Sequence, residues 1–451
     1  MVLSAYNLWA IGLVLLIISI CGAHLLKRKY LSLCALALAV VLFGSVRMHL
    51  SQINKSNIVS NFSGKTLTTE LTVTDFSSDG RVFAYFMDSA TKNKVCIHTH
   101  NPVRLSPGEI IECELSFTQP SDSSFSNYLS SRGFHLQATT EGVKKKGFLK
   151  DGIMGAVYSL RRYMDNLGER YFSGNSRALF NAMIFGDKSF VSDDLSKALS
   201  GSGLSHIAVV SGMHLNVMIA ILMFFTRKAF GQMKIGLIVA ICGSLFIALV
   251  SGFGASVGRA LIMHLIFYLA QLLYREGDGL TALFTTAFLM IFINPYIIFN
   301  AGFVLSVLSV LGIILFTDRF SVIFTRFLPA PVATTLAATF GAQLATVPAV
   351  VCYFGIITPY APISNIFAVP LAGIYVILGI IMTLLSPIKI FNTILVPIIN
   401  FMAYGIEAIC SIVSRIPLST IECVANPWVF SLVWCFLAFL IYKKLPRAEK
   451  I

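Results

Sequence analysis

The sequence is poor in charged residues. Only 12% of its 451 residues are Asp, Glu, Lys or Arg, whereas 56% are hydrophobic. Soluble proteins of this length carry about twice that charged fraction. The chain also has no phosphate-binding loop of the GxxxxGK[S/T] type, and its nine cysteines include no CxxC pair. These absences argue against a soluble protein, a P-loop ATPase and a zinc or iron–sulfur framework, and they indicate no cofactor.

Long apolar runs are abundant instead. Runs of roughly twenty apolar residues, the length that crosses a hydrocarbon core, recur along most of the chain. This length criterion predicts a polytopic α-helical membrane protein with about eleven transmembrane helices. Their approximate positions are 1–26, 31–46, 204–226, 233–251, 257–274, 280–294, 301–316, 331–353, 362–386, 390–413 and 428–442.

The segment from Met48 to about Lys150 has a different pattern. Short alternating segments, separated by turn sequences such as "SSDG" and "QPSDSS", predict strands at 67–74, 81–87, 94–98, 109–117 and 134–140. In "EIIECELSF", every second residue from Ile111 to Phe117 is apolar, which is typical of a strand with one buried face. With a helix expected near 125–132, the segment predicts a small five-stranded antiparallel barrel.

Residues 148–200 are expected to form amphipathic helices, and Ser192 is expected to cap one of them in "SDDLSKAL". The chain is therefore predicted to divide into five parts. These are two N-terminal transmembrane helices (1–47), the β domain (48–147), an amphipathic helical linker region (148–200), a transmembrane domain (201–442) and a tail (443–451).

Charge predicts the orientation, because short loops rich in Lys and Arg stay in the cytoplasm. Such loops contain Lys27 to Lys29, Arg227 with Lys228 and Lys234, Arg319 with Arg326, Lys389, and the tail from Lys443. Alternation through eleven spans then puts the N-terminus and the barrel outside the cytoplasm and the C-terminus inside. The formal net charge of +13 needs no nucleic acid to explain it.

The predicted barrel contains two cysteines, Cys96 and Cys113, on strands expected to be neighbours. Outside the cytoplasm such a pair can form a disulfide. We predict a disulfide between them, with two free buried thiols as the open alternative.

Strongly polar residues inside the predicted spans indicate a polar path, because such groups are costly in hydrocarbon. They are His206, Ser211, His214, Asn216, Arg259, His264, Gln271, Gln343, Asn365, Asn400 and Glu407. Several have structural alternatives. Asn400 can bridge two helices, His264 can be a packing residue, and Glu407 can form a structural ion pair. Arg259 can reach the membrane surface or point a positive charge into a pore.

Two kinds of chemistry are possible for the histidines. A metal site is disfavoured, because His206 and His214 lie about 80° apart on a straight helix and no carboxylate or thiolate nearby completes a ligand set. An intramembrane serine hydrolase would use Ser211 as the nucleophile and His214 or His264 as the base.

The longest pattern is "RALFNAMIFGDKSFVSDDLSKALSGSGLSHIAVVSGMHLNVM", from Arg177 to Met218. It resembles the signature of the ComEC/Rec2 family of competence proteins. "GFGASVGRALIMH", "NPYIIFNAGFVLSVLSVLGIILF" and "GAQLATVPAVVCYFGIITPYAPISNIFAVPLAG" resemble the later blocks of that family in the same order. "LSPGEIIECELSF" with "SNYLSSRGFHLQA" is similar to the OB-like extracytoplasmic domain of the family.

The resemblance implies transport of single-stranded DNA across the bacterial cytoplasmic membrane during natural transformation. The positions that match the family blocks are Gly203, Ser205, His206, Ser211, Gly212, His214, Arg259, Gln343 and Asn365 with Pro370. Glu407 is added as a channel candidate because of its intramembrane charge. A secondary transporter of small solutes is, like the serine hydrolase, an alternative function.

An OB-like barrel binds single strands by aromatic stacking in a basic groove. The candidates for this role are Arg81, Phe83, Tyr85, Lys92, Lys94 and Arg104, although any of the aromatic residues could belong to the barrel core.

One family feature is missing. Many longer members carry a metallo-β-lactamase-like domain with an HxHxDH motif, and this sequence has no such motif. A channel without nuclease activity is therefore expected, with a separate nuclease as a partner. The resemblance also implies membrane lipid around the chain, a ComEA-like extracytoplasmic DNA receptor, a cytoplasmic helicase-like ATPase and single-stranded-DNA-binding proteins.

Overall fold

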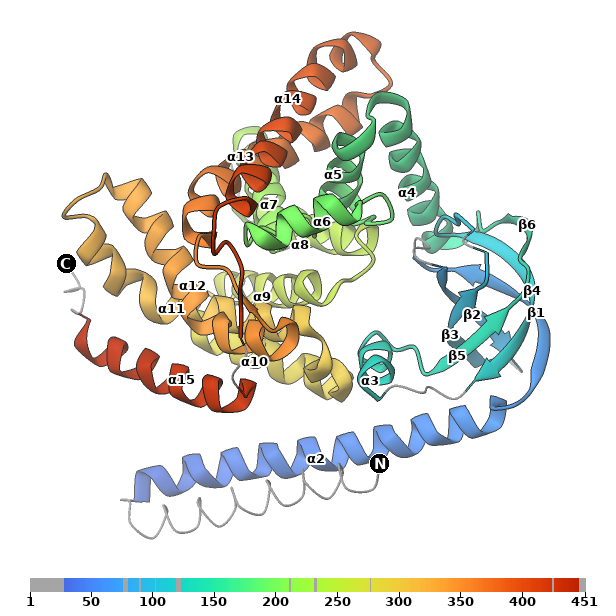
Figure 1. Cartoon of the computed structure of the whole chain (residues 1–451), viewed down its shortest axis with the longest axis horizontal. Coiled ribbons are helices and arrows are strands. Elements are labelled where there is room, and N and C mark those ends of the chain that lie inside the picture. The colour runs from blue at the N-terminus through green and yellow to red at the C-terminus, as the bar shows by residue number, and fades with distance from the viewer. Residues whose placement is uncertain are drawn as a thin grey trace.

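The computed structural model describes residues 28–75, 80–88, 91–101, 103–118, 123–210, 212–230, 233–275, 277–423 and 426–445. The predicted span at 1–26, Ser211 and the last six residues lie outside them. A small β-barrel lies at one side of a group of helices, and the long helix α2 passes beneath both (Figure 1).

Helix α2 is one continuous helix, Arg28–Phe62. It runs well past the predicted end at residue 46, so the first part of the expected β domain is helical. Ile58 and Phe62, one turn apart, both pack against the barrel core, and this contact explains why the helix continues. The ring of Phe62 lies 5.6 Å from that of Phe86 and 5.2 Å from that of Phe117, so the end of α2 packs onto the barrel.

All five predicted strands are present. They are β1 Thr66–Val73, β2 Arg81–Asp88, β3 Thr91–Thr99, β4 Glu109–Thr118 and β5 Leu136–Thr140, with α3, Ser123–Ser131, before the last. They close in the order β1-β2-β3-β5-β4-β1. The prediction of an antiparallel barrel is wrong at one pair, because β3 and β5 are parallel. A closed ring with an odd number of strands cannot alternate in direction throughout, so at least one pair must be parallel.

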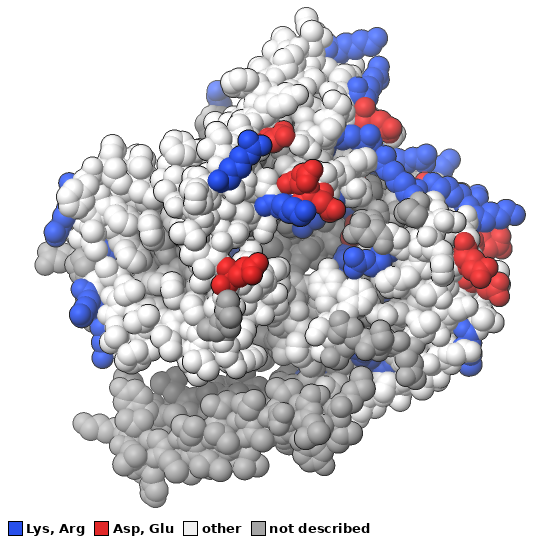
Figure 2. Space-filling view, viewed as in Figure 1, with Lys and Arg blue, Asp and Glu red and all other residues white. Residues whose placement is uncertain are grey.

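A sixth strand, β6 Lys144–Phe148, pairs with β4 and was not predicted. Its sequence, "KKKGF", has no apolar alternation because its first four residues are exposed. Figure 2 shows Lys and Arg gathered over β6 and α4, whereas the surface of α11, α12 and α15 is mostly uncharged.

The predicted disulfide does not form, and both thiols are free. Strand β5 lies between β3 and β4, so the two cysteines are not on neighbouring strands. Cys113 belongs to the barrel interior, whereas Cys96 packs on the other side of the wall with Phe83, Leu129 and Phe134. The alternative of two free buried thiols is therefore correct. Burial raises the pKa of each thiol to about 11.

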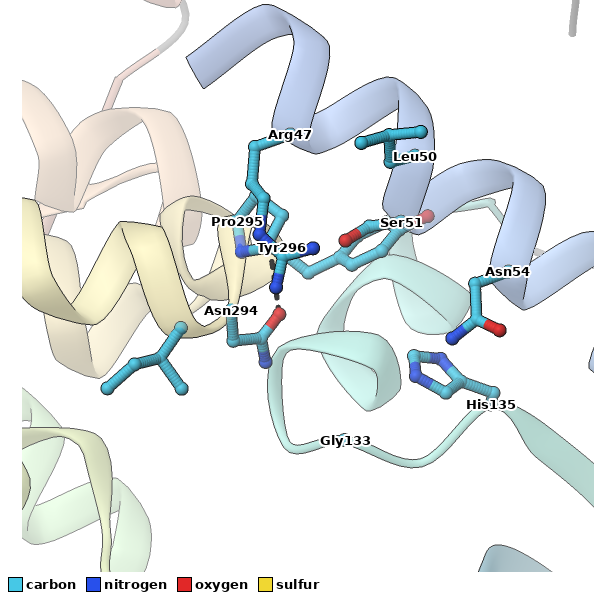
Figure 3. Close-up of a pocket in the computed structure, with 10 residues that line it drawn as sticks. Arg47, Leu50, Ser51, Asn54, Gly133, His135, Asn294, Pro295 and Tyr296 are labelled. Carbon is cyan, nitrogen blue, oxygen red and sulfur yellow. Dashed lines mark hydrogen bonds between the residues drawn. The ribbon is translucent and has the colours of Figure 1, made fainter. Parts of the chain in front are cut away.

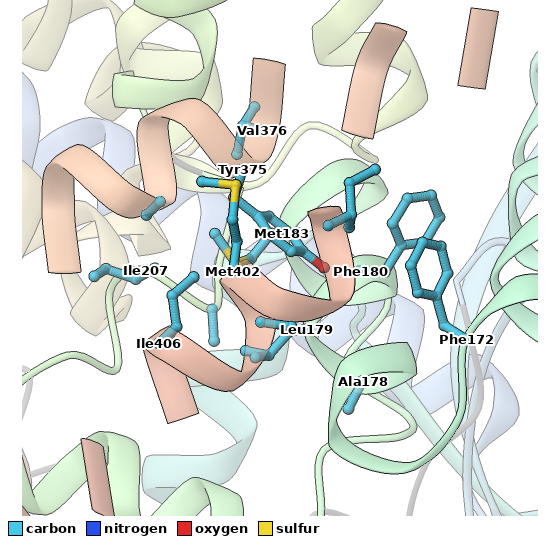
Figure 4. Close-up of a cluster of buried hydrophobic side chains, with 14 of the residues drawn as sticks. Phe172, Ala178, Leu179, Phe180, Met183, Ile207, Tyr375, Val376, Met402 and Ile406 are labelled. Atoms are coloured by element: carbon cyan, nitrogen blue, oxygen red, sulfur yellow. The ribbon is translucent and has the colours of Figure 1, made fainter. Parts of the chain in front are cut away.

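Three helices connect the barrel to the remaining helices: α4 Gly152–Tyr171, α5 Gly174–Phe185 and α6 Asp193–Gly201. Ser192 caps α6 as predicted, since its Oγ accepts from the amide of Leu195 at 3.2 Å. Helix α5 is not amphipathic but largely buried. Its Phe180 stacks on Phe172 at 4.5 Å, and the cluster extends to Tyr375 and Met402 (Figure 4). Helices α13 and α14 thus pack against α4–α6.

The remaining elements are α7 Gly212–Phe230, α8 Met233–Val250, α9 Ala255–Leu272, α10 Gly279–Ile293, η1 Pro295–Phe299, α11 Ala301–Phe324, α12 Ala330–Phe354, β7 Ile356–Ile357, α13 Ala361–Leu385, α14 Lys389–Ser414, β8 Ile421–Glu422 and α15 Pro427–Lys444. Within the described residues, six helices are long and apolar enough to cross a membrane, namely α9 and α11–α15. The chain is therefore a membrane protein with a barrel domain, and the count of about eleven spans stays a prediction.

Candidate functional site

The segment between α6 and α7 holds Gly203, Ser205, His206 and Ser211 of the residues that match the family signature. We call residues 202–210 the signature loop. The span predicted at 204–226 is wrong at its start, because this loop consists of turns and the helix begins only at Gly212. The cause is the end of α6. Gly203 has a φ of +74°, and the amides of Gly203 and Leu204 donate to the carbonyls of Ser200 and Leu199 at 3.0 and 2.8 Å. This is the Schellman pattern that ends helices.

Gly203 in the signature loop, and Gly201 and Gly212 at its two ends, let this segment approach its neighbours closely. A Cβ on Gly201 would lie 3.1 Å from Cβ of Ser414, at the end of α14. On Gly203 it would lie 2.4 Å from Cβ of Ala361, at the start of α13. On Gly212 it would lie 3.1 Å from a guanidinium nitrogen of Arg259 in α9. The loop is thus held between α14, α13 and α9, so its small residues serve close packing.

The two histidines of this segment have different environments. His206 and its neighbour Ser205 are exposed, and Nδ1 of His206 lies 3.2 Å from the carbonyl oxygen of Gly203. His214, in the first turn of α7, is only 2% exposed. No group of three His, Cys, Asp or Glu side chains that could hold a metal occurs in the described part of the chain. Ser211 lies outside that part, so no observed contact supports the hydrolase hypothesis.

Arg259 is a buried cation, 7% exposed, beside the start of α7. Its Nε donates to Oγ of Ser306 on α11 at 2.6 Å, and Nη1 contacts Sδ of Met263 at 3.1 Å. Among the described residues no carboxylate pairs with it. A guanidinium with neutral partners keeps its full charge, so Arg259 can attract an anion from within the helices.

Gln343 joins this site through the turn between α12 and α13. Its Nε2 donates to the carbonyl of Thr358 at 3.0 Å, and Thr358 is also the residue that faces Gly203. Asn365 lies one turn into α13, and its buried Oδ1 has no hydrogen-bond partner among the described residues. The structure thus brings Gln343 and Gly203 to one turn.

Glu407 has a different role. Its Oε1 accepts from Nδ2 of Asn175 at 2.7 Å, and Asn400 accepts from Ser176 one residue further along α5. Both bonds join α14 to α5. Asn400 is therefore the helix bridge that the sequence left open, and Glu407 makes a hydrogen bond to a neutral amide.

The six barrel candidates do not form one surface. Arg81, Tyr85 and Lys94 share the outer face of β2 and β3, where Tyr85 is directly opposite Lys94. Lys92 also lies on this face, with its Nζ 3.6 Å from the centre of the Tyr85 ring. Phe83 is buried beneath α3, so its ring is not open to a base.

Arg104 belongs to an ion-pair network instead. One of its guanidinium nitrogens lies 2.9 Å from each carboxylate oxygen of Asp165, in α4. Asp165 also accepts from Asn181 at 3.1 Å and lies 3.9 Å from Arg177. This network joins the barrel to α4 and α5, so Arg104 stabilises the contact between the barrel and these helices.

A second group of ion pairs, centred on Asp75, was also not predicted from the sequence. Arg161, in α4, lies 3.3 Å from Asp75 of the barrel, and Arg132 pairs with the same carboxylate at 2.7 Å. Arg161 and Asp165 are buried with Tyr158 and Met164 in one helical stripe. In "YSLRRYMDNLGERY", Arg161 and Asp165 fall on the same helical stripe as the apolar residues, whereas a charge that faces solvent would fall outside it. This spacing is the sequence pattern that could have predicted buried ion pairs.

Residues 183–447 match the model of the protein family described as "Competence protein". The chain is 22% identical to "ComE operon protein 3" of Bacillus subtilis (strain 168) over 64% of its length and 36% of the relative's. It is 27% identical to an "Uncharacterized protein" of Aquifex aeolicus (strain VF5) over 48% of its length and 50% of the relative's. The chain thus matches half or less of each relative's length. No solved structure matches it significantly.

Proposed function

Because the chain belongs to the competence protein family over residues 183–447, we propose that it transports single-stranded DNA across the bacterial cytoplasmic membrane during natural transformation. The observation that carries this proposal is the extent of the family match. The match begins within α5 and includes the signature loop and the six helices of the described residues that could cross a membrane. The proposed role is that of a channel, with no catalytic step.

The chemistry of the site suits this cargo. Single-stranded DNA is a polyanion with exposed bases, so its passage needs polar or positive groups that accept any sequence. Arg259 supplies a fixed positive charge, and Ser205 and His206 supply exposed polar groups on the loop that leads to it. We propose that these three residues face DNA; Ser211, the fourth candidate of this segment, lies outside the described residues.

The other signature residues would shape the passage. Gly203 and Gly212 permit the close contacts of the loop, and Gln343 fixes the turn that Gly203 faces. His214 is a buried polar residue of this set, and Asn365 has a buried side-chain oxygen. Glu407 would contribute through the contact between α14 and α5.

On the barrel, we propose that Arg81, Tyr85, Lys92 and Lys94 make the first contact with the strand. Their shared outer face supports this role, since Tyr85 offers a ring for base stacking, Lys92 and Lys94 lie beside it, and Arg81 lies further along the same face. Arg104 is left out because it pairs with Asp165, and Phe83 because it is buried.

The predicted topology and domain division become part of the proposal. The barrel would lie outside the cytoplasm, and the C-terminus inside. Two hydrogen bonds support a position of Arg319 and the end of α15 on the same side of the membrane. Nη1 of Arg319 donates to the carbonyls of Tyr442 and Leu445 at 3.0 and 3.1 Å. A DNA receptor would deliver the strand from outside. A helicase-like ATPase and single-stranded-DNA-binding proteins would take it up inside, and a separate nuclease would degrade the other strand.

The test follows labelled duplex DNA in a deletion strain, with label scored separately outside and inside the cytoplasm. Deletion should abolish cytoplasmic entry and leave surface binding unchanged. Complementation with Arg259→Gln should reduce entry about tenfold or more, because a buried cation facing a polyanion is lost. Arg415→Gln, which removes an exposed arginine beyond α14, is the matched control and should restore entry fully. Wild-type entry in the deletion strain would overturn the proposal.

A further inference from the structure

A cavity of 420 Å³ lies where α2, the barrel and η1 meet. Figure 3 shows Asn54 and His135 opposite each other on one side of it, with Arg47 and Asn294 on the other. Its walls come from three segments far apart in the sequence. The cavity is distinct from the signature loop and from the outer face of β2 and β3.

The charges around this cavity favour an anion. Arg47 lines it, and within the described part of the chain its Nε alone donates a hydrogen bond, to the carbonyl of Phe292 at 3.2 Å. Lys55 lies close by, with its Nζ 5.3 Å from the centre of the Tyr296 ring. No Asp or Glu is among the described residues that line the cavity. Burial, and then the charges of Lys55 and Lys94, lower the pKa of His135 to about 4, which is consistent with positive surroundings.

Hydrogen-bond donors are also available. Ser51 and Asn54 present a hydroxyl and an amide from consecutive turns of α2. The Nδ1 of His135 is buried and has no hydrogen-bond partner among the described residues. Asn294 is already engaged, since it donates to the carbonyls of Ser130 and Ser131 at 3.1 and 2.9 Å. It therefore holds the wall of the cavity, while the other groups stay open to a ligand.

One edge of the cavity is apolar and exposed. Ile293 ends the apolar helix α10 and is 69% exposed, and Leu50 of α2 is 53% exposed. A free phosphate gains nothing from such an edge, whereas a lipid has acyl chains to place there. We infer that this cavity binds the phosphate of an anionic phospholipid headgroup, with its acyl chains along α2 and α10. The bound lipid would stabilise the contact between the barrel, α2 and η1 at the membrane surface.

The test uses the purified full chain in detergent and dihexanoyl phosphatidylglycerol, with dihexanoyl phosphatidylcholine as the neutral counterpart. Calorimetry should show tighter binding of phosphatidylglycerol. Asn54→Asp should weaken that binding at least about tenfold, because it places a second negative charge beside the phosphate. Asn57→Asp is the matched control, because Asn57 is an exposed asparagine on the same helix that does not line the cavity. Arg47→Gln, which adds no charge, should also weaken binding.

Equal affinity for the two lipids would overturn the inference, as would equal losses in Asn54→Asp and Asn57→Asp. Two further probes separate the source of the phosphate. If inorganic phosphate or a thymidine oligonucleotide bound as tightly as phosphatidylglycerol, and Asn54→Asp weakened that binding alone, the lipid assignment would be wrong.

Discussion

Replacing Gly203 by alanine perturbs the contact on which the shape of the signature loop depends. The new Cβ would lie 2.4 Å from Cβ of Ala361, whereas nonbonded carbons are ordinarily about 3.5–4.0 Å apart. The φ of +74° at this position is also unfavourable for any residue with a Cβ. Two separate costs therefore add at one position.

The magnitudes can be separated with a second glycine. A left-handed conformation costs alanine about 1–2 kcal/mol, and overpacking costs about 1–3 kcal/mol. Gly203→Ala should therefore lose about 2–5 kcal/mol of unfolding free energy. Gly355 ends α12 with a φ of +70°, and a Cβ added to it would meet no heavy atom within 4 Å. Gly355→Ala should show only the conformational cost, about 1–2 kcal/mol.

Both variants should be unfolded in mixed micelles with increasing denaturing detergent, and DNA entry should be scored in parallel. Gly203→Ala should be less stable than Gly355→Ala by about 1–3 kcal/mol and should lose DNA entry. Gly355→Ala should keep entry, because its strain lies outside the loop. Equal stability of the two variants would refute the argument that close packing at α13 shapes the loop.

Three further outcomes are expected. Ser192→Ala should cost about 1 kcal/mol of unfolding free energy, because the cap of α6 is lost, and Ser192→Asp should restore it; no loss on the alanine change would contradict the cap. Cys96 and Cys113 should resist maleimide at pH 8 in the folded chain, where burial keeps their pKa near 11, and both should react after unfolding without reductant; protection in the unfolded chain would indicate a disulfide. Asp187 is 1% exposed, and burial raises its pKa, so the folded state binds its proton more tightly than the unfolded state does. The free energy of unfolding should therefore fall as the pH rises above the usual pKa of an aspartate. Asp187→Asn should reduce this pH dependence, and an unchanged pH profile in the variant would contradict the argument.

The barrel was predictable because its signals are local. Each strand shows apolar alternation bounded by turn residues, so five strands and α3 were found to within a few residues. The pairing was harder, since the neighbours of β3 depend on closure of the whole ring. The prediction ended helix α2 too early because residues 48–62 are largely polar. Only the contact of Ile58 and Phe62 with the barrel shows why the helix continues.

The candidate site was predictable in residue type but not in arrangement. Glycines in "GSGLSHIAVVSGMH" indicated close packing, and the structure adds that α14, α13 and α9 are the elements they approach. No pattern could show that Arg104 pairs with Asp165, because the two residues lie 61 positions apart. Long-range pairing of this kind depends on the packed fold, and local periodicity carries no information about it.

The segment from Arg177 to Met218 connects the two parts of the protein physically. In its first half, the ring of Phe190 lies 4.1 Å from the guanidinium of Arg177 and 4.2 Å from that of Arg104 on the barrel. Each cation–π contact of this kind contributes about 0.5–2 kcal/mol. In its second half, Gly203 and Gly212 hold the loop against α13 and α9. The longest sequence pattern of the chain thus contacts both the barrel and the helices α13 and α9.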